Sequence, residues 1–123
     1  MNNKKEPLLI NRAKSVRYAF KGALLLLKTE PSIKIQFCIA VLVSIAGFYF
    51  EISTTEWMIQ ILAIALVMSI EGANTAIEEI ANFIHPEYHI KIGKIKDLAA
   101  GAVFIASVFA VIVGLIIYLP KIF

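Results

Sequence analysis

Two carboxylates and an amide interrupt an otherwise apolar helical stretch near the middle of the sequence. Glu71, Asn74 and Glu78 are spaced at i, i+3 and i+7, so they share one helix face, here called the acidic face. A carboxylate in this setting can accept a proton from a hydroxyl, and carboxylate oxygens are also the ligands that Mg²⁺ prefers. The face therefore fits general-base catalysis or metal binding. The alternative is a polar cluster that only holds helices together.

The depth of the acidic face in a membrane follows from the apolar block before it, which begins at Trp57. We place Trp57 at the outer interface, where Trp is enriched. At a helical rise of about 1.5 Å per residue, Glu71 lies roughly 21 Å deeper and Glu78 roughly 32 Å deeper, against a hydrocarbon core of about 30 Å. Glu71 is thus predicted in the inner leaflet. An ionisable side chain there is costly, which favours a functional role.

Further charged side chains flank the acidic face on its cytoplasmic side. Lys96 and Asp97 stand where the third apolar block begins. A lysine at this boundary can bind phosphate as a point charge, or it can extend its ammonium group to the interface without a ligand. Glu30 precedes the first apolar block, and together with Glu78 it could form an oxygen-rich Mg²⁺ site that also holds nucleotide phosphates.

The composition predicts that these residues are positioned by membrane helices. The chain has 123 residues, of which 59% are hydrophobic, and its mean hydropathy is +0.80. A soluble domain is about 45–50% apolar. We expect one domain, 1–123, with an all-α membrane fold and three transmembrane helices at about 33–50, 57–84 and 98–119. A span needs about 20 apolar residues, so the second span is long enough only if its polar part enters the membrane.

A basic amphipathic helix is expected before the first span, over about 11–28. Val16, Phe20 and Leu24 recur at helical spacing, while basic residues lie mostly elsewhere on the helical wheel. This pattern is typical of a helix that lies in the membrane interface. The alternative, a helix packed on a soluble core, is disfavoured by the three apolar blocks that follow.

The distribution of Lys and Arg predicts the orientation of the chain. The loop at 51–56 has no basic residue, whereas the N-terminal region and the loop at 85–96 are rich in them. The positive-inside rule therefore places the N-terminus in the cytoplasm and the C-terminus outside. Anionic lipid accounts for the net charge of +3, so we expect no nucleic-acid partner. The basic residues concerned are Lys4, Lys5, Arg12, Lys14, Arg17, Lys21, Lys28, Lys91, Lys94 and Lys96.

Two segments, EGANTAIEEI (71–80) and KIKDLAAGAV (94–103), resemble the signature of the small prokaryotic diacylglycerol kinase family, which includes undecaprenol kinases. The similarity covers nearly the whole chain. It implies an ATP-dependent, Mg²⁺-dependent lipid kinase in the bacterial cytoplasmic (inner) membrane. It also implies a homotrimer whose active sites are built at subunit boundaries. The motifs of P-loop NTPases and protein kinases are missing from the sequence, so such a kinase would use neither fold.

The resemblance also assigns roles to individual residues. Glu71 would act as the base on the lipid hydroxyl, and Asn74 would position groups near it. Glu30 and Glu78 would bind Mg²⁺ with ATP. Nucleotide contacts are implied at Tyr18, Glu30, Glu78, Glu87, Tyr88, His89, Lys96 and Asp97, and lipid contacts at Arg12, Lys34 and Ala100. The sequence departs from the common family pattern at Ser32, Gly72 and Asn82.

The expected reaction is phosphorylation of diacylglycerol to phosphatidic acid, and the alternative is phosphorylation of undecaprenol to undecaprenyl phosphate. The motif serves both lipids. A small transporter with an intramembrane carboxylate would explain Glu71, but it would not explain Asn74, Glu78 and Lys96 on the cytoplasmic side. A subunit that only packs against others would leave the intramembrane carboxylate unexplained.

Overall fold

The fold is all-α in the part of the chain that the structure describes, residues 6–123 of a computed structural model. Four helices follow one another there: α1 (Leu8–Thr29), α2 (Pro31–Tyr49), α3 (Thr54–Ile84) and α4 (Ile90–Ile122). This confirms the predicted fold class. Lys4 and Lys5, which contribute to the predicted charge asymmetry, lie outside the described residues.

Short local signals set the helix boundaries around the first two connections. Glu30 has an extended backbone (φ −95°, ψ 114°), which ends α1, and Pro31 occupies the first turn of α2. Proline suits that position because its missing N–H would have no partner in the helix. At the start of α3, the Glu56 backbone N–H donates to Ser53 Oγ at 3.1 Å, and the Ser53 N–H donates to Glu56 Oε1 at 2.9 Å. This reciprocal pair is a capping box.

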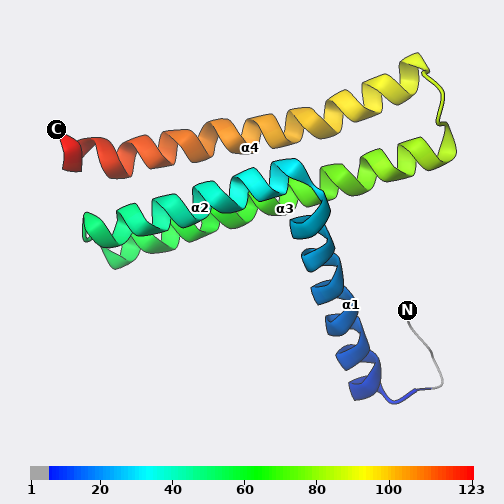
Figure 1. Cartoon of the computed structure of the whole chain (residues 1–123), viewed down its shortest axis with the longest axis horizontal. Helices are drawn as coiled ribbons and strands as arrows, with labels where there is room; N and C mark the ends of the chain where they lie inside the picture. Colours follow the sequence, from blue (N-terminus) through cyan, green and yellow to red (C-terminus); the bar gives the residue numbers. More distant parts are fainter. Residues whose placement is uncertain (1–5) are drawn as a thin grey trace.

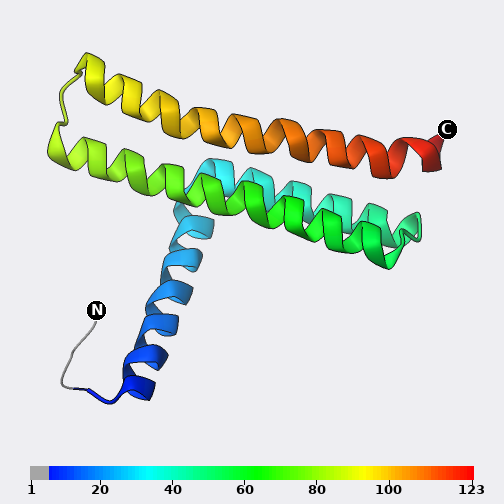
Figure 2. The same cartoon turned by 180° about the vertical axis from the view of Figure 1, so that it is seen from behind.

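Helices α2, α3 and α4 are each long and apolar enough to cross a membrane. They lie side by side, and α1 joins them at the start of α2 and projects away from them at a steep angle (Figure 1; Figure 2). Helix α1 has no buried residue and is not among the candidate spans. A basic helix that stands at a steep angle to the three spans is the arrangement expected of the predicted surface helix, because such a helix would lie in the plane of the membrane.

Helices α3 and α4 are longer than the membrane requires. Their 31 and 33 residues correspond to about 46 and 50 Å, whereas the hydrocarbon core is about 30 Å thick. The excess lies at their shared connection, which extends past the start of α2 (Figure 1). Helix α4 begins at Ile90, well before the apolar block at 98–119, and its first two turns are polar. The acidic face continues into this extension.

Three side-chain contacts fix the antiparallel alignment of α3 and α4. They are spread along the pair from the start of α3 to the α3–α4 connection, and their registers agree to within one residue. Ala100 on α4 therefore lies level with Glu78 on α3, and Ser107 lies level with Glu71. The contacts are Lys121 Nζ to Glu56 Oε2 at 3.1 Å, Tyr118 Oη to Gln60 Oε1 at 2.5 Å, and Lys96 Nζ to Asn82 Oδ1 at 2.7 Å.

Candidate active site

Glu71 is buried in the helical bundle, with 8% of its surface exposed. The Asn74 side-chain amide donates a hydrogen bond to Glu71 Oε2 at 3.4 Å, one turn along the same face. Asn74 Oδ1 is also buried, and it has no hydrogen-bond partner within the described residues. The pair thus presents a carboxylate and an unpaired amide oxygen, which can accept a proton and a hydrogen bond from an incoming hydroxyl.

Gly72 brings the end of α1 against α3 beside Glu71. A Cβ added at Gly72 would lie 2.9 Å from Leu26 Cδ1, so a larger residue would push Leu26 away. Glu30 follows one turn after Leu26, and its backbone N–H donates to the Leu26 carbonyl at 3.0 Å. Glu30, half-buried, therefore stands at the junction of α1 and α2 close to α3. The departure from the family pattern at Gly72 has a structural role, because it makes room for α1.

Lys96 joins the acidic face from α4. Its ammonium group donates to Asn82 Oδ1 at 2.7 Å, and Asn82 lies one turn beyond the half-buried Glu78. Because asparagine is neutral, this contact holds the ammonium group in place without compensating its charge. Lys96 forms no ion pair within residues 6–123. The departure at Asn82 thus leaves a cation available for phosphate. The neighbouring Asp97 is exposed.

The connection between α3 and α4 carries the predicted nucleotide contacts Glu87, Tyr88 and His89. His89 caps α4, because the Lys91 backbone N–H donates to His89 Nδ1 at 3.0 Å. His85 Nδ1 donates to the Glu87 carbonyl at 2.7 Å, which closes the turn. Tyr88 is 88% exposed and Glu87 is exposed too. Within one chain, the His89 side chain and the Glu87 backbone carbonyl order the loop, whereas the side chains of Glu87 and Tyr88 are exposed.

A single chain brings together only part of the predicted site. The ends of α1 and α4 meet the acidic face, and Ala100 lies level with Glu78. Tyr18 and Arg12 lie farther back along α1, roughly 18 and 27 Å from Glu30 along the helix axis. Both are exposed, as is Lys34 on α2. Because Tyr18 and Arg12 lie far from the acidic face in one chain, their nucleotide and lipid contacts would be made with a neighbouring subunit, which stays a prediction.

The donors for Mg²⁺ are few but chemically suitable. Within residues 6–123 there is no group of three or more His, Cys, Asp or Glu side chains that could hold a metal alone. Glu30 and Glu78 are half-buried carboxylates. Mg²⁺ is commonly bound through one or two carboxylates together with substrate phosphates and water. Two carboxylates therefore fit a metal that arrives with a nucleotide.

Sequence reasoning did not single out Gln36, Gln60 and Tyr118 as a group. Gln60 is buried, with 5% of its surface exposed, and its side-chain amide donates to the Val43 carbonyl at 3.3 Å. Gln36 Oε1 is buried and has no partner in the described part of the chain. Two glutamines inside apolar blocks were the available signal, because a polar side chain in a membrane helix is costly unless it is paired or used.

Comparison with known proteins identifies the family of the chain. The family model for prokaryotic diacylglycerol kinase matches residues 17–118. An undecaprenol kinase from Bacillus subtilis is 40% identical over 108 residues, which is 88% of each chain. A diacylglycerol kinase from Synechocystis is 34% identical over 86% of this chain and 61% of its own length. A diacylglycerol kinase from Escherichia coli K12 is 29% identical over 80% of this chain and 81% of its own.

An all-α membrane fold, a buried carboxylate–amide pair and a family match over most of the chain define a membrane lipid kinase. The chain belongs to the prokaryotic diacylglycerol kinase family.

Proposed function

We propose that the chain transfers the γ-phosphoryl group of ATP to the hydroxyl of a membrane lipid, with Mg²⁺, at the cytoplasmic side of the bacterial inner membrane. The observation that carries this proposal is the buried Glu71 with Asn74 hydrogen-bonded to it. Lipid headgroup hydroxyls lie near the same depth, and the charges needed to hold nucleotide phosphates lie on the cytoplasmic side of this pair.

In the proposed reaction the lipid hydroxyl oxygen attacks the γ-phosphorus and forms the new O–P bond. Its proton passes to Glu71, the bond between the γ-phosphorus and the bridging oxygen breaks, and ADP leaves with that oxygen. Bound Mg²⁺ would neutralise phosphate charge, held by Glu30 and Glu78. Lys96 adds a fixed positive charge. Phosphoryl transfer requires mainly positioning and charge stabilisation, so a small site is sufficient.

For the lipid we propose undecaprenol, with diacylglycerol as the alternative. The support is the 40% identity to an undecaprenol kinase over 88% of both chains, against 34% and 29% for two diacylglycerol kinases. This reverses the order of the expected and the alternative lipid given from the sequence, because the motifs are common to both activities and only the identities separate them.

The two lipids are best compared in one experiment. The purified protein is placed in vesicles that contain equal amounts of undecaprenol and diacylglycerol, and it is given ATP and Mg²⁺. Undecaprenyl phosphate is expected to form with the higher kcat/KM. A higher value for diacylglycerol would assign that lipid instead, and failure to phosphorylate either lipid would contradict the proposed function.

We further propose that the active enzyme is a homotrimer with its N-terminus in the cytoplasm. The support is that Tyr18 lies roughly 18 Å back from Glu30 along α1. Helix α1 projects away from the three spans, whereas the loop Glu87–His89 lies at the far end of α3 and α4 (Figure 1). Nucleotide contacts from both could meet only if a second chain supplied one of them. Cross-linking in the membrane followed by mass measurement tests this. A monomer with full activity would contradict it.

A further inference from the structure

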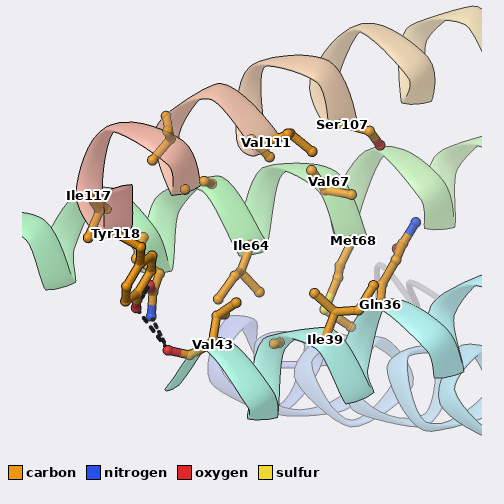
Figure 3. A pocket seen from close by; sticks show the side chains of 16 residues that line it. Gln36, Ile39, Val43, Ile64, Val67, Met68, Ser107, Val111, Ile117 and Tyr118 are labelled. Carbon is orange, nitrogen blue, oxygen red and sulfur yellow. Dashed lines mark hydrogen bonds between the residues drawn. The ribbon is translucent and has the colours of Figure 1, made fainter. Parts of the chain in front are cut away.

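A pocket of about 300 Å³ lies between α2, α3 and α4, and its wall is almost entirely apolar. Figure 3 shows side chains from all three helices pointing into it. In the fold this pocket occupies the membrane-embedded part of the bundle, on the outer side of Glu71. The residues that line it include Ala40, Val43, Ile64, Val67, Val111 and Gly114.

The pocket lies on the same face of α3 as the catalytic carboxylate. Ile64 and Val67 line it, and Glu71 follows them at i+7 and i+4. The acidic face is therefore a direct continuation of the pocket wall. On α4, Ser107 lines the pocket and lies level with Glu71, so the α4 wall of the pocket also ends beside Glu71.

The outer end of the pocket is closed by a polar contact among the three helices. Tyr118 Oη lies 2.5 Å from Gln60 Oε1 and 2.9 Å from the Val43 carbonyl oxygen (Figure 3). The inner end is marked by Gln36, which lies near Met68 and Ser107 (Figure 3) and whose Oε1 is buried without a partner in the described residues. The pocket is thus an apolar space with a polar group at each end.

We infer that this pocket, here called the tail pocket, receives the hydrocarbon chain of the lipid substrate, and that the Tyr118–Gln60 contact limits the length of chain that the pocket accepts. The inference rests on the proposed function. A lipid whose hydroxyl lies at Glu71 must direct its chain away from the cytoplasm. The pocket begins next to Glu71 and extends in that direction. From Glu71 to Gln60 is roughly 16 Å along α3. A polyprenol has one chain, which matches one pocket, and the rest of a longer chain would leave into the bilayer.

Gly114 offers a direct way to fill the tail pocket. It lines the pocket, and a Cβ added there would have no neighbour within 4 Å. Gly114→Leu therefore extends a side chain into the space from a Cβ that meets no other atom within 4 Å. Ile116→Phe is the matched control, because Ile116 is 68% exposed and lies on the other side of the same helix.

The test measures kcat/KM for prenols of increasing length in both variants and in the wild type. The wild-type value should rise with each added isoprene unit and level off near 16 Å of chain. In Gly114→Leu, kcat/KM should level off at a shorter chain length. For long prenols it should be about tenfold lower than in the wild type, as expected when about two methylenes are displaced from the pocket. The kcat/KM for short prenols and the KM for ATP should be unchanged. Ile116→Phe should follow the wild type.

Equal losses at every chain length, or no loss at all, would overturn the inference. So would dissociation of the oligomer in Gly114→Leu alone, because the pocket would then hold a second copy of the chain. A wild type that phosphorylates no prenol and no diacylglycerol would instead contradict the proposed function.

A second measurement does not depend on activity or on any variant. A prenol with a photoreactive group about 16 Å from its hydroxyl is bound to the wild-type protein and irradiated. The label should fall on residues at the outer end of the pocket, such as Val43 and Tyr118. A label confined to exposed side chains such as Ile116 would place the chain outside the pocket and overturn the inference.

Discussion

At the scale of single residues, the account depends on Glu71. Its Oε2 accepts a hydrogen bond from Asn74, and its surface is almost fully covered by the bundle. A hydroxyl is a poor nucleophile until its proton leaves, and a carboxylate within hydrogen-bond reach can take that proton during transfer. This makes Glu71 the residue whose chemistry is most open to test.

Glu71→Gln should lower kcat for lipid phosphorylation by about 10²- to 10⁴-fold, because the amide keeps the size of the side chain but cannot act as a base. The KM for ATP should change little, and the oligomer should elute normally on a sizing column. Glu51→Gln, in the exposed turn at the other end of α3, is the matched control and should be fully active. Near-normal turnover in Glu71→Gln would show that Glu71 only holds helices together.

Glu78→Gln should raise the Mg²⁺ concentration for half-maximal activity by at least about tenfold, because it removes one anionic ligand from a hard cation. Glu30→Gln should behave in the same way, and high Mg²⁺ should restore part of the activity of both. Glu79→Gln changes the neighbouring exposed carboxylate on α3 and should keep the wild-type Mg²⁺ dependence. Wild-type dependence in Glu78→Gln would remove that residue from the metal site.

At the scale of elements, the packing of α2 against α3 depends on one glycine. A Cβ at Gly47 would lie 2.7 Å from Trp57 Cη2 and 3.1 Å from Ile52 Cδ1. Trp57 also contacts Phe48, with ring centroids 4.9 Å apart. The end of α2 and the start of α3 are therefore held together by the Trp57 side chain, which packs directly against the backbone of Gly47.

Gly47→Ala should lower the free energy of unfolding in detergent by about 1–3 kcal/mol, the usual cost of overpacking. Gly101→Ala is the control, because a Cβ there meets nothing within 4 Å and alanine favours a helix over glycine. Thermal or denaturant unfolding followed by circular dichroism measures both. Equal stability of Gly47→Ala and the wild type would show that α2 and α3 are not closely packed at this point.

The sequence predicts the features that depend on local spacing. The shared face of Glu71, Asn74 and Glu78 needs only the period of a helix, and the fold class needs only the apolar blocks. The contact between Gln60 and Tyr118 joins residues 58 positions apart, so no local pattern reveals it. In the fold, the Tyr118 hydroxyl is hydrogen-bonded inside the bundle. The early start of α4 at Ile90 was also missed, because its polar first turns lack an apolar pattern.

At the scale of the whole molecule, the orientation predicted from the Lys and Arg distribution would place the site on the side where ATP is found. Helices α2, α3 and α4 are each long and apolar enough to cross a membrane, and three crossings would put α1 and the end of α4 on opposite sides. Helix α1 and the α3–α4 connection, which both carry basic residues in the sequence, lie toward the same end of the bundle (Figure 1). The cytoplasmic N-terminus stays a prediction of the positive-inside rule.

Reporter fusions should give a cytoplasmic signal at the N-terminus and an external signal at the C-terminus. Replacing Lys91, Lys94 and Lys96 together with Gln should weaken this preference, because these residues retain the second loop in the cytoplasm. Fusions at both ends that report the same side would contradict the arrangement of three spans.

The central claim is that this chain moves the terminal phosphate of ATP onto a membrane lipid. The direct measurement supplies the purified protein in vesicles of bacterial lipid extract with ATP labelled at either the γ- or the α-phosphate, and then separates the organic phase. Label from γ-labelled ATP should enter the lipid fraction in a Mg²⁺-dependent manner, and label from α-labelled ATP should stay in the aqueous phase. If γ-label remains in the water, as ATP or as free phosphate, the chain is not a lipid kinase under these conditions and the account is contradicted.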